Sequence, residues 1–215
     1  NLNEEMLIRR QMERFRRREV FHYHKLNDSV AADRFLGQFR KVTHAPLNVL
    51  VINFIDILSH ARTESRMVRE LASNEAAYRS ITLSWFKHTA IKDLLTYLAS
   101  LDYDILITTD HGSIRVDAPI RVVGDKNVNT NLRYKVGKNL GYNKKEVFEM
   151  RDPEQYGLPR PNLSSNYIFA EGNKFFAYPN NYNYYVQYYK GTFQHGGISM
   201  EEMIIPIIAL HSKKY

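Results

Sequence analysis

The apolar residues of the chain fall into short runs that predict β-strands. The runs 49–55, 103–107 and 204–210 are rich in valine, isoleucine and leucine and have the length of buried strands. Pro206 marks the start of the last of these strands or its place at a sheet edge. Weaker runs predict three further short strands, at 119–123, 167–170 and 175–178.

Helices are predicted between these runs. A cap at Asn3 predicts a helix over 3–15, and a second helix should extend from residue 28 or 29 to residue 41. Two more helices fit between 64 and 101, with a break at His88 and Thr89. In the second of these, apolar residues recur at helical spacing and should face the core: Ile91, Leu94, Leu95, Leu98 and Leu101.

This order of elements indicates an α/β fold. The composition changes after Pro153, where prolines, serines and asparagines mark an irregular connection. The tyrosine-rich stretch 182–189 is interpreted as part of a half-buried β-meander, with stacking on nucleobases as the alternative. We expect a helical segment over residues 1–45, used for contacts with other domains or subunits. Residues 46–215 should form the body of the domain.

Composition narrows the class of protein. A chain of 215 residues with 44% hydrophobic residues can fold as one domain with a real core. No run is long and apolar enough to predict a membrane span, and the first residues do not form a signal peptide. The chain contains no cysteine, which excludes disulfides and thiolate ligands and fits a cytoplasmic protein. Because residue 1 is not methionine, we expect the chain to be part of a longer protein.

The positive charge is concentrated in one stretch. The formal net charge is +7, and residues 115–145 hold eight basic residues against two aspartates, which leaves 8 − 2 = +6 there. Such a segment favours an anionic substrate. A solvated loop that happens to be basic is an equally good interpretation.

Three short motifs carry candidate chemistry. Asp110 and His111 follow the run 103–107, and a carboxylate beside an imidazole at a strand end is a plausible ligand pair for Zn²⁺ or Mn²⁺. Asp56 and His60 follow the run 49–55 and would face the same side of a helix. His195 precedes two glycines, which let the backbone approach a ligand closely. We interpret these five residues together as metal ligands.

With these motifs in place, the chain resembles the alkaline phosphatase superfamily, and within it the PglZ-type domain. The resemblance rests on Asp56 and His60, on the Thr-Asp-His-Gly of 109–112, and on the His-Gly-Gly and Glu-Glu of 195–202. Residues 192–208 are most similar to the PglZ-type domain of response regulators in type IX secretion. The resemblance implies an alkaline-phosphatase-like sheet with flanking helices, incomplete at the N-terminus, and a hydrolase with two divalent cations, Zn²⁺ or alternatively Mn²⁺.

The resemblance also implies roles for individual residues. Asp56, His60 and His195 would hold one cation, and Asp110 and His111 the second. The second cation would also need an aspartate and a serine or threonine nucleophile, which we expect upstream of this chain. The hydroxyl nearest in sequence is that of Thr43, directly before the strand of Asp56. We therefore assign no catalytic residue within the chain and expect the chain alone to be inactive or nearly so.

Substrate contacts are predicted from charge and alternation. Arg133 and Lys135 flank Tyr134, so in a strand both would lie on one face and bind phosphate oxygens. The alternative interpretation of this pair is a solvent-facing sheet edge.

Two functions compete. The first is a metal-dependent phosphodiesterase or phosphatase domain of a response regulator that controls protein secretion, acting on an anionic diester or nucleotide. The second is a phosphatase-like module kept for dimerisation and partner binding, which the arginine run 14–18 favours. Sequence-specific DNA binding has only the net charge in its favour, because no helix-turn-helix or zinc-finger pattern occurs.

Overall fold

The structure is a computed structural model that describes residues 3–27, 29–42, 45–124 and 128–212. Contacts between Cα atoms divide the chain into two compact units. The first comprises Asn1–His60, Val68–Tyr103 and His211–Tyr215, and the second comprises Ala61–Met67 and Asp104–Leu210. The expected division between residues 45 and 46 remains a prediction.

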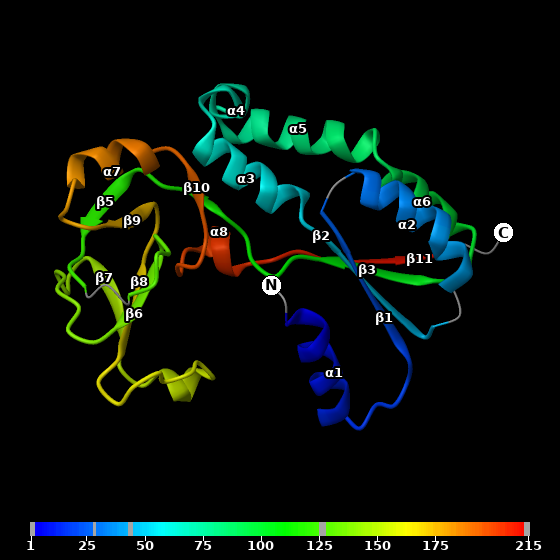
Figure 1. Ribbon diagram of the computed structural model, residues 1–215, viewed down its shortest axis with the longest axis horizontal. Helices are drawn as coiled ribbons and strands as arrows, with labels where there is room; N and C mark the ends of the chain where they lie inside the picture. Colours follow the sequence, from blue (N-terminus) through cyan, green and yellow to red (C-terminus); the bar gives the residue numbers. More distant parts are fainter. Residues whose placement is uncertain (1–2, 28, 43–44, 125–127, 213–215) are drawn as a thin grey trace. The chain divides into compact units, whose positions relative to one another are not determined.

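The first unit is built around a parallel strand pair. Strand β1 (Phe21–Leu26) lies beside β2 (Leu47–Ile52), in a register that runs from Phe21 opposite Leu47 to Leu26 opposite Ile52 (Figure 1). Parallel neighbours need a crossover connection. Helix α2 (Ser29–Val42) supplies it and packs on β1 and on α6 (Ala90–Ala99). Strand β1 was not predicted, because its sequence Phe-His-Tyr-His-Lys-Leu hides the apolar signal of a strand.

The core of the first unit confirms the predicted helical face. In α6, Ile91, Leu94 and Leu98 are buried, whereas Leu95 is only partly buried, as is Leu101 beyond the end of the helix. Rings from α2 complete this core: Phe35 lies 5.3 Å from Phe39 and 4.5 Å from the imidazole of His24, between centroids. The predicted helices at 3–15 and 28–41 are confirmed as α1 (Glu4–Arg14) and α2.

Three helices occupy the stretch for which two were predicted. They are α4 (Arg66–Leu71), α5 (Glu75–Lys87) and α6, and α3 (Phe54–Glu64) precedes them. The extra boundary is at Asn74, whose side chain accepts a hydrogen bond of 2.9 Å from the backbone N–H of Ala77 and caps α5. The predicted break at His88 and Thr89 is confirmed, because His88 ends α5 and Thr89 precedes α6.

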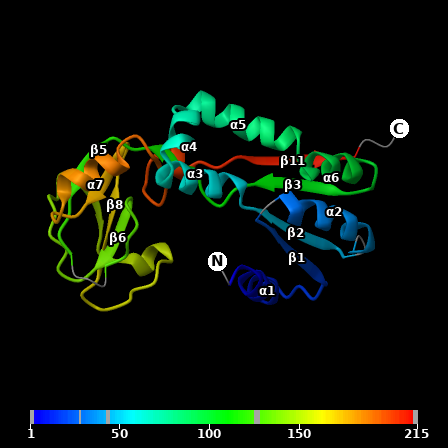
Figure 2. The ribbon, with the colours of Figure 1, turned by 45° about the horizontal axis from the view of Figure 1, so that its top comes forward.

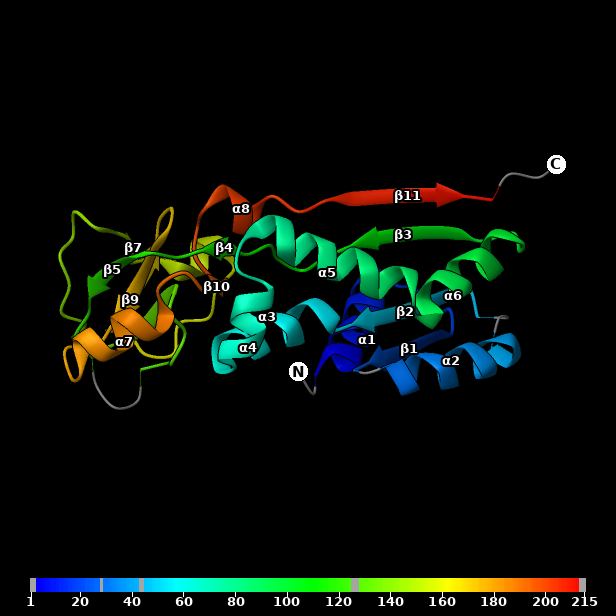
Figure 3. The same cartoon turned by 90° about the horizontal axis from the view of Figure 1, so that it is seen from above.

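The second unit consists of small sheets. Strand β3 (Asp104–Thr108) pairs with β11 (Ile207–His211), and the two lie side by side in Figures 2 and 3. Strands β4 (Ile114–Arg115) and β10 (Phe193–Gln194) are antiparallel, and β5 (Ala118–Arg121) and β9 (Lys174–Ala177) are parallel. A three-stranded antiparallel sheet has the order β6 (Tyr134–Gly137), β8 (Asn166–Ala170), β7 (Val147–Met150).

The strands predicted at 103–107, 119–123, 167–170, 175–178 and 204–210 are confirmed as β3, β5, β8, β9 and β11. Pro206 stands directly before β11, as expected. The expected burial of the first of these was wrong, because Leu106 of β3 is 66% exposed. Strand β3 pairs with β11 alone among the strands that the structure describes. The core of the unit lies instead beside β5, β8 and β9, around Ile120, Ile168 and Phe176.

The tyrosine-rich stretch is a helix, α7 (Tyr182–Tyr189), so the β-meander predicted there was wrong. Tyr182, Val186 and Tyr189 recur at the i, i+4, i+7 spacing of one helix face. They pack against the buried side chains of Phe175 and Val116. The β-propensity of tyrosine is outweighed by this apolar face, because packing decides secondary structure more strongly than propensity does.

The architecture is therefore mixed α/β, as predicted, whereas a single alkaline-phosphatase-like sheet remains a prediction. Two further short helices, η1 (Pro153–Tyr156) and α8 (Met200–Met203), belong to the second unit. Within the described ranges, the structure contains no helix with the length and apolar character that a membrane span requires.

Candidate metal centre

The first candidate pair lies on α3. Asp56 is in the first turn of this helix and His60 one turn later, and Nε2 of His60 lies 3.6 Å from Oδ1 of Asp56. Both side chains are more than half exposed, at 68% for His60 and 52% for Asp56. The prediction that helical spacing brings the two to the same side is confirmed.

The second candidate pair follows β3. The backbone N–H of His111 donates to Oδ1 of Asp110 over 3.1 Å, and Nε2 of His111 lies 3.7 Å from the same oxygen. Nδ1 of His111 lies 3.0 Å from the carbonyl oxygen of Gly112. A carbonyl only accepts, so this hydrogen bond places the proton on Nδ1 and leaves the lone pair of Nε2 for a cation.

His195 is brought to this pair by strand pairing. Strand β10 ends at Gln194, which is opposite Ile114 of β4, so the residues beyond both strand ends meet. The imidazole rings of His111 and His195 stack with centroids 3.9 Å apart and planes inclined by 10°. The two residues are 195 − 111 = 84 positions apart in the chain, so this meeting is a property of the fold.

Gly112 shows how closely the two motifs approach. Its N–H donates to the carbonyl of Glu202 over 2.9 Å. A Cβ atom at residue 112 would lie 1.9 Å from the carbonyl oxygen of Glu201, so only glycine fits there. The backbone of the Thr-Asp-His-Gly motif is therefore in direct contact with the backbone of the Glu-Glu pair in helix α8.

The five predicted ligands fall into two sets. Asp56 and His60 belong to the first unit, whereas Asp110, His111 and His195 belong to the second, and the structure brings the two imidazoles of that second set together. The joint binding of one cation by Asp56, His60 and His195 remains a prediction. Among the described residues, no group of three or more such side chains already has the positions of a metal site. The chemistry of the donors, carboxylate and imidazole without sulfur, fits Zn²⁺ or Mn²⁺.

Arg133 and Lys135 are both buried, at 0% and 1% exposure. The alternative interpretation, a solvent-facing edge, was therefore wrong. Two oxygens of Glu202 accept from the guanidinium of Arg133, and the Nζ of Lys135 donates to the carbonyl of Asn129 over 2.7 Å. The side chains of Arg133 and Lys135 thus both have partners within the protein. Their predicted role in binding phosphate oxygens remains a prediction, and it would require them to exchange those partners for the substrate.

Lys135 is a buried cation whose neighbours carry no compensating charge in its described contacts. Its Nζ lies 4.6 Å from the centre of the Tyr178 ring, in addition to the hydrogen bond to Asn129. Burial lowers the pKa of Lys135 from 10.5 to about 8. This lysine is therefore partly neutral in mildly alkaline solution.

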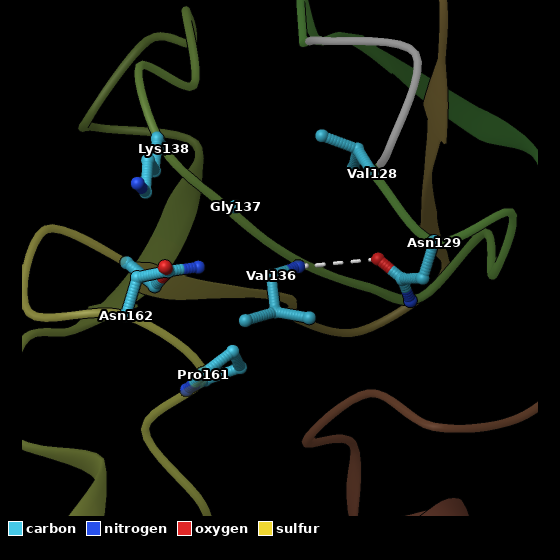
Figure 4. A pocket seen from close by; sticks show the side chains of 8 residues that line it. Val128, Asn129, Val136, Gly137, Lys138, Pro161 and Asn162 are labelled. Atoms are coloured by element: carbon cyan, nitrogen blue, oxygen red, sulfur yellow. Dashed lines mark hydrogen bonds between the residues drawn. The ribbon is translucent and has the colours of Figure 1, made fainter.

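A pocket of about 410 Å³ opens elsewhere in the second unit (Figure 4). Its wall includes Lys138 and Asn162, and the N–H of Val136 donates to Oδ1 of Asn129 across 3.1 Å. None of the predicted ligands or substrate contacts lines this pocket. The predicted ligands and substrate contacts therefore lie outside this cavity.

Sequence reasoning missed three residues that hold the second set in place. Asn131 donates to the carbonyl of His195 over 3.3 Å, and Glu202 binds the guanidinium of Arg133. Arg62 is 2% exposed, donates to the carbonyl of Gly191 over 2.7 Å and lies over the ring of Phe193. The one available signal was Ser-x-x-Glu at 199–202, a pattern typical of a helix start.

Comparison with known proteins gives one family. The model described as the BREX system PglZ alkaline phosphatase-like domain matches residues 1–210, which is nearly the whole chain. A search of curated proteins found none that matches the chain.

Proposed function

Because the chain belongs to the PglZ family of alkaline phosphatase-like domains, we propose that it contributes the metal ligands of a hydrolase acting on phosphate esters, with phosphodiesters as its preferred substrates. The family indicates a phosphatase-like function. The choice of diesters, the identity of the cations and the roles of individual residues are our proposal.

One observation supports the proposal most strongly. Two imidazoles from segments 84 positions apart in sequence (195 − 111) stack at 3.9 Å, and a carboxylate belongs to the same loop. Two-cation hydrolases hold their cations roughly 3.5–4 Å apart. Imidazoles at this separation suit an arrangement in which each ring serves a different cation.

In this proposal Asp56, His60 and His195 hold one divalent cation, and Asp110 and His111 hold the second, with Zn²⁺ favoured over Mn²⁺. When bound, such a pair of cations neutralises charge on the phosphate oxygens and stabilises the leaving group. The tautomer of His111, fixed by the Gly112 carbonyl, keeps Nε2 available for this role. Exposed basic residues of 115–145, such as Arg121 and Lys138, attract the anionic substrate.

The test uses a protein that carries this chain together with the upstream segment proposed to supply the nucleophile. Replacing Asp110 or His111 by alanine should abolish hydrolysis of bis(p-nitrophenyl) phosphate in the presence of Zn²⁺ or Mn²⁺, while the circular dichroism spectrum is unchanged. His88→Ala is the matched control, because His88 is exposed and lies at the end of α5. Full activity of the Asp110→Ala and His111→Ala variants would refute the assignment. Faster hydrolysis of p-nitrophenyl phosphate than of the diester would refute the preference for diesters.

The nucleophile is not assigned within the chain. Thr43 lies outside the described residues, and the hydroxyl of Thr109 donates to the carbonyl of His111 over 2.9 Å. We expect the 215-residue chain alone to show at most trace turnover with added Zn²⁺ or Mn²⁺. Turnover equal to that of the longer protein would place the nucleophile within the chain, and Thr109 would then be the first residue to mutate.

A second candidate is a regulatory module that binds partners without turnover. It is favoured by α1, whose exposed side chains include Leu7 at 56% and which is followed by Phe15 at 65% and the arginines 16–18. Glu4 holds this helix on β1 by binding Lys25 over 3.2 Å and the hydroxyl of Tyr23. Sedimentation of wild type and of a Leu7→Glu/Phe15→Glu variant tests it. A wild-type dimer that the variant breaks would support the module, and a wild-type monomer would contradict it.

The biological setting is a separate proposal. The stretch 192–208 resembles the response regulator PorX, from which we propose a cytoplasmic regulator of type IX protein secretion, whereas the family description refers to the BREX system. Deleting the gene in the source organism distinguishes the two. Loss of secretion supports the regulator, and unchanged secretion contradicts it.

A further inference from the structure

Among the ion pairs that the structure describes, that between Arg133 and Glu202 is the most deeply buried, with side chains 0% and 2% exposed. Nε and Nη2 of Arg133 donate to the two carboxylate oxygens over 2.8 and 2.6 Å, in the bidentate arrangement that fixes both groups in direction as well as distance. Nη2 also donates to the carbonyl of Ala170 over 3.2 Å, and Nη1 donates to that of Lys174. The guanidinium is thus tied to both strands β8 and β9.

The carboxylate of Glu202 joins this cation to the loop that carries His195. Oε1 also accepts the N–H of Gly197 over 2.9 Å, and Oε2 accepts the N–H of Ser199 over 3.1 Å. Burial by itself raises the pKa of Glu202, but the hydrogen bonds from Arg133, Ser199 and Gly197 outweigh it, so the net pKa is lowered. Glu202 therefore stays ionised and holds the residues directly after His195.

The backbone of Glu202 holds the other imidazole. Its carbonyl accepts the N–H of Gly112, the residue that follows His111. Both glycines fit closely: a Cβ at residue 197 would lie 2.6 Å from Nη2 of Arg133, and one at residue 112 would lie 1.9 Å from the carbonyl of Glu201. One residue, Glu202, thus contacts the chain next to His111 with its backbone and next to His195 with its side chain.

We propose that the Arg133–Glu202 pair is a positioning device that sets the imidazoles of His111 and His195 at the separation needed to hold cations. In this role both residues act through the backbone around the two histidines. That the imidazoles are positioned in order to hold cations rests on the proposed function. That the Arg133–Glu202 pair sets their separation does not, and it is tested on the metal-free chain.

The choice of residues supports positioning over mere stability. Replacing a buried ion pair by apolar side chains is often neutral or stabilising, so a pair that only held the fold together would gain nothing from its charge. Apolar side chains, however, make no directional hydrogen bonds. Four N–H groups from three residues converge on one carboxylate, and this fixes the path of 195–202 relative to β8 and β9.

The experiment compares three variants of the 215-residue chain. Arg133→Met/Glu202→Met removes the charges together, and Glu202→Gln keeps the size of the side chain but turns one acceptor into a donor facing Arg133, Gly197 or Ser199. The control is Arg151→Met/Glu149→Met. That pair is also bidentate, with distances of 3.1 and 3.3 Å, but Arg151 is 65% exposed and neither residue contacts the two histidine motifs in the described contacts.

The first readout is the nuclear Overhauser effect between the ring protons of His111 and His195, without metal. Wild type and control should show it, and both Glu202 variants should lose it while their circular dichroism and cooperative thermal unfolding are retained. The second readout is Zn²⁺ affinity measured by competition with a chelating dye, which should fall about 10- to 100-fold in both Glu202 variants, as for residues that orient metal ligands.

The outcomes separate the two proposals. A folded variant that keeps both the ring contact and the Zn²⁺ affinity would overturn the positioning role. If the double methionine variant unfolds, Glu202→Gln decides the question by the same two readouts. If the ring contact depends on Glu202 but the wild-type protein of the hydrolysis test acts on no phosphate ester, the positioning role stands and the proposed function fails.

Discussion

The two histidine-bearing regions of the protein are built in different ways. On α3, Asp56 and His60 meet because they are four positions apart on one helix, and both remain exposed. In the second unit, His111 and His195 meet because β4 pairs with β10 and because Glu202 holds the chain beside each of them. The first pair needs only a helix, whereas the second needs a buried ion pair and two glycines.

The first pair is therefore set by local spacing in the chain, and the second by long-range contacts. A helix sets the spacing of i and i+4 side chains wherever it forms, so the α3 pair tolerates changes in its surroundings. The second pair depends on contacts between residues up to 202 − 112 = 90 positions apart, and it should be sensitive to single changes that touch neither histidine. The predictions that follow test this contrast.

The largest effect is expected from Gly112→Ala. The added methyl would meet the carbonyl of Glu201 at 1.9 Å, so the backbone must move, and we expect a loss of about 3 kcal/mol in the free energy of unfolding. Urea unfolding measures this loss. Gly37→Ala is the control, because a Cβ there meets nothing within 4 Å and the residue lies in α2. It should stabilise by about 0.5–1 kcal/mol. Equal effects of the two changes would contradict the close packing at Gly112.

Lys135→Met tests how a buried cation of the second unit affects stability, because the ammonium of Lys135 has no carboxylate partner in its described contacts. The folded lysine releases its proton near pH 8, whereas the unfolded one keeps it until about pH 10.5. The free energy of unfolding of wild type should therefore rise with pH in this window, relative to the variant. The gain is at most about 3 kcal/mol. Urea unfolding of both proteins at pH 7 and pH 10 measures it, and a constant difference would show that the ammonium is not desolvated.

Arg62→Met removes support from the strand that leads to His195. The guanidinium donates to the carbonyl of Gly191 and covers the ring of Phe193, so its loss removes the shorter of the two described hydrogen bonds to that carbonyl and the cover of the ring. We expect a cost of about 2 kcal/mol in the free energy of unfolding. Arg9→Met is a suitable control, because the exposed Arg9 side chain binds Glu5 at the surface of α1. A smaller cost for Arg62→Met than for Arg9→Met would contradict the role given to Arg62.

The smallest effect is expected on α3. Asp56→Asn/His60→Gln should change the free energy of unfolding by less than about 0.5 kcal/mol, because both side chains are exposed and their pairing is screened by solvent. The same variant should nevertheless bind one Zn²⁺ fewer than wild type in equilibrium dialysis. Unchanged metal content would exclude Asp56 and His60 from the ligand set.

Particular residues show how far the sequence alone predicts this structure. The helical spacing of Ile91, Leu94 and Leu98 and the residue type of Asn3 before α1 are local signals, and the helices they predict are confirmed, although the Asn3 side chain makes no capping hydrogen bond. Strand β1 escaped prediction because His22 and His24 interrupt its apolar pattern. Helix α7 was mistaken for strands because its apolar face is made of tyrosines.

The candidate site shows the same limit. The pairing of Asp56 with His60 on one side of a helix was predicted, because it depends only on spacing within one element. The burial of Arg133 against Glu202 was not, because the partners are 202 − 133 = 69 positions apart and each is of a type that usually lies at the surface. Charge alternation around Tyr134 predicted a shared face for Arg133 and Lys135, but it carried no information on what would cover that face.

The most direct test of a two-cation centre is an anomalous difference map from crystals of the chain grown with Zn²⁺. The account predicts two peaks roughly 4 Å apart, one bound by Asp110 and His111 and the other by His195 together with Asp56 and His60. A single peak bridged by both imidazoles, or a peak at His195 whose other ligands lack Asp56 and His60, would contradict it.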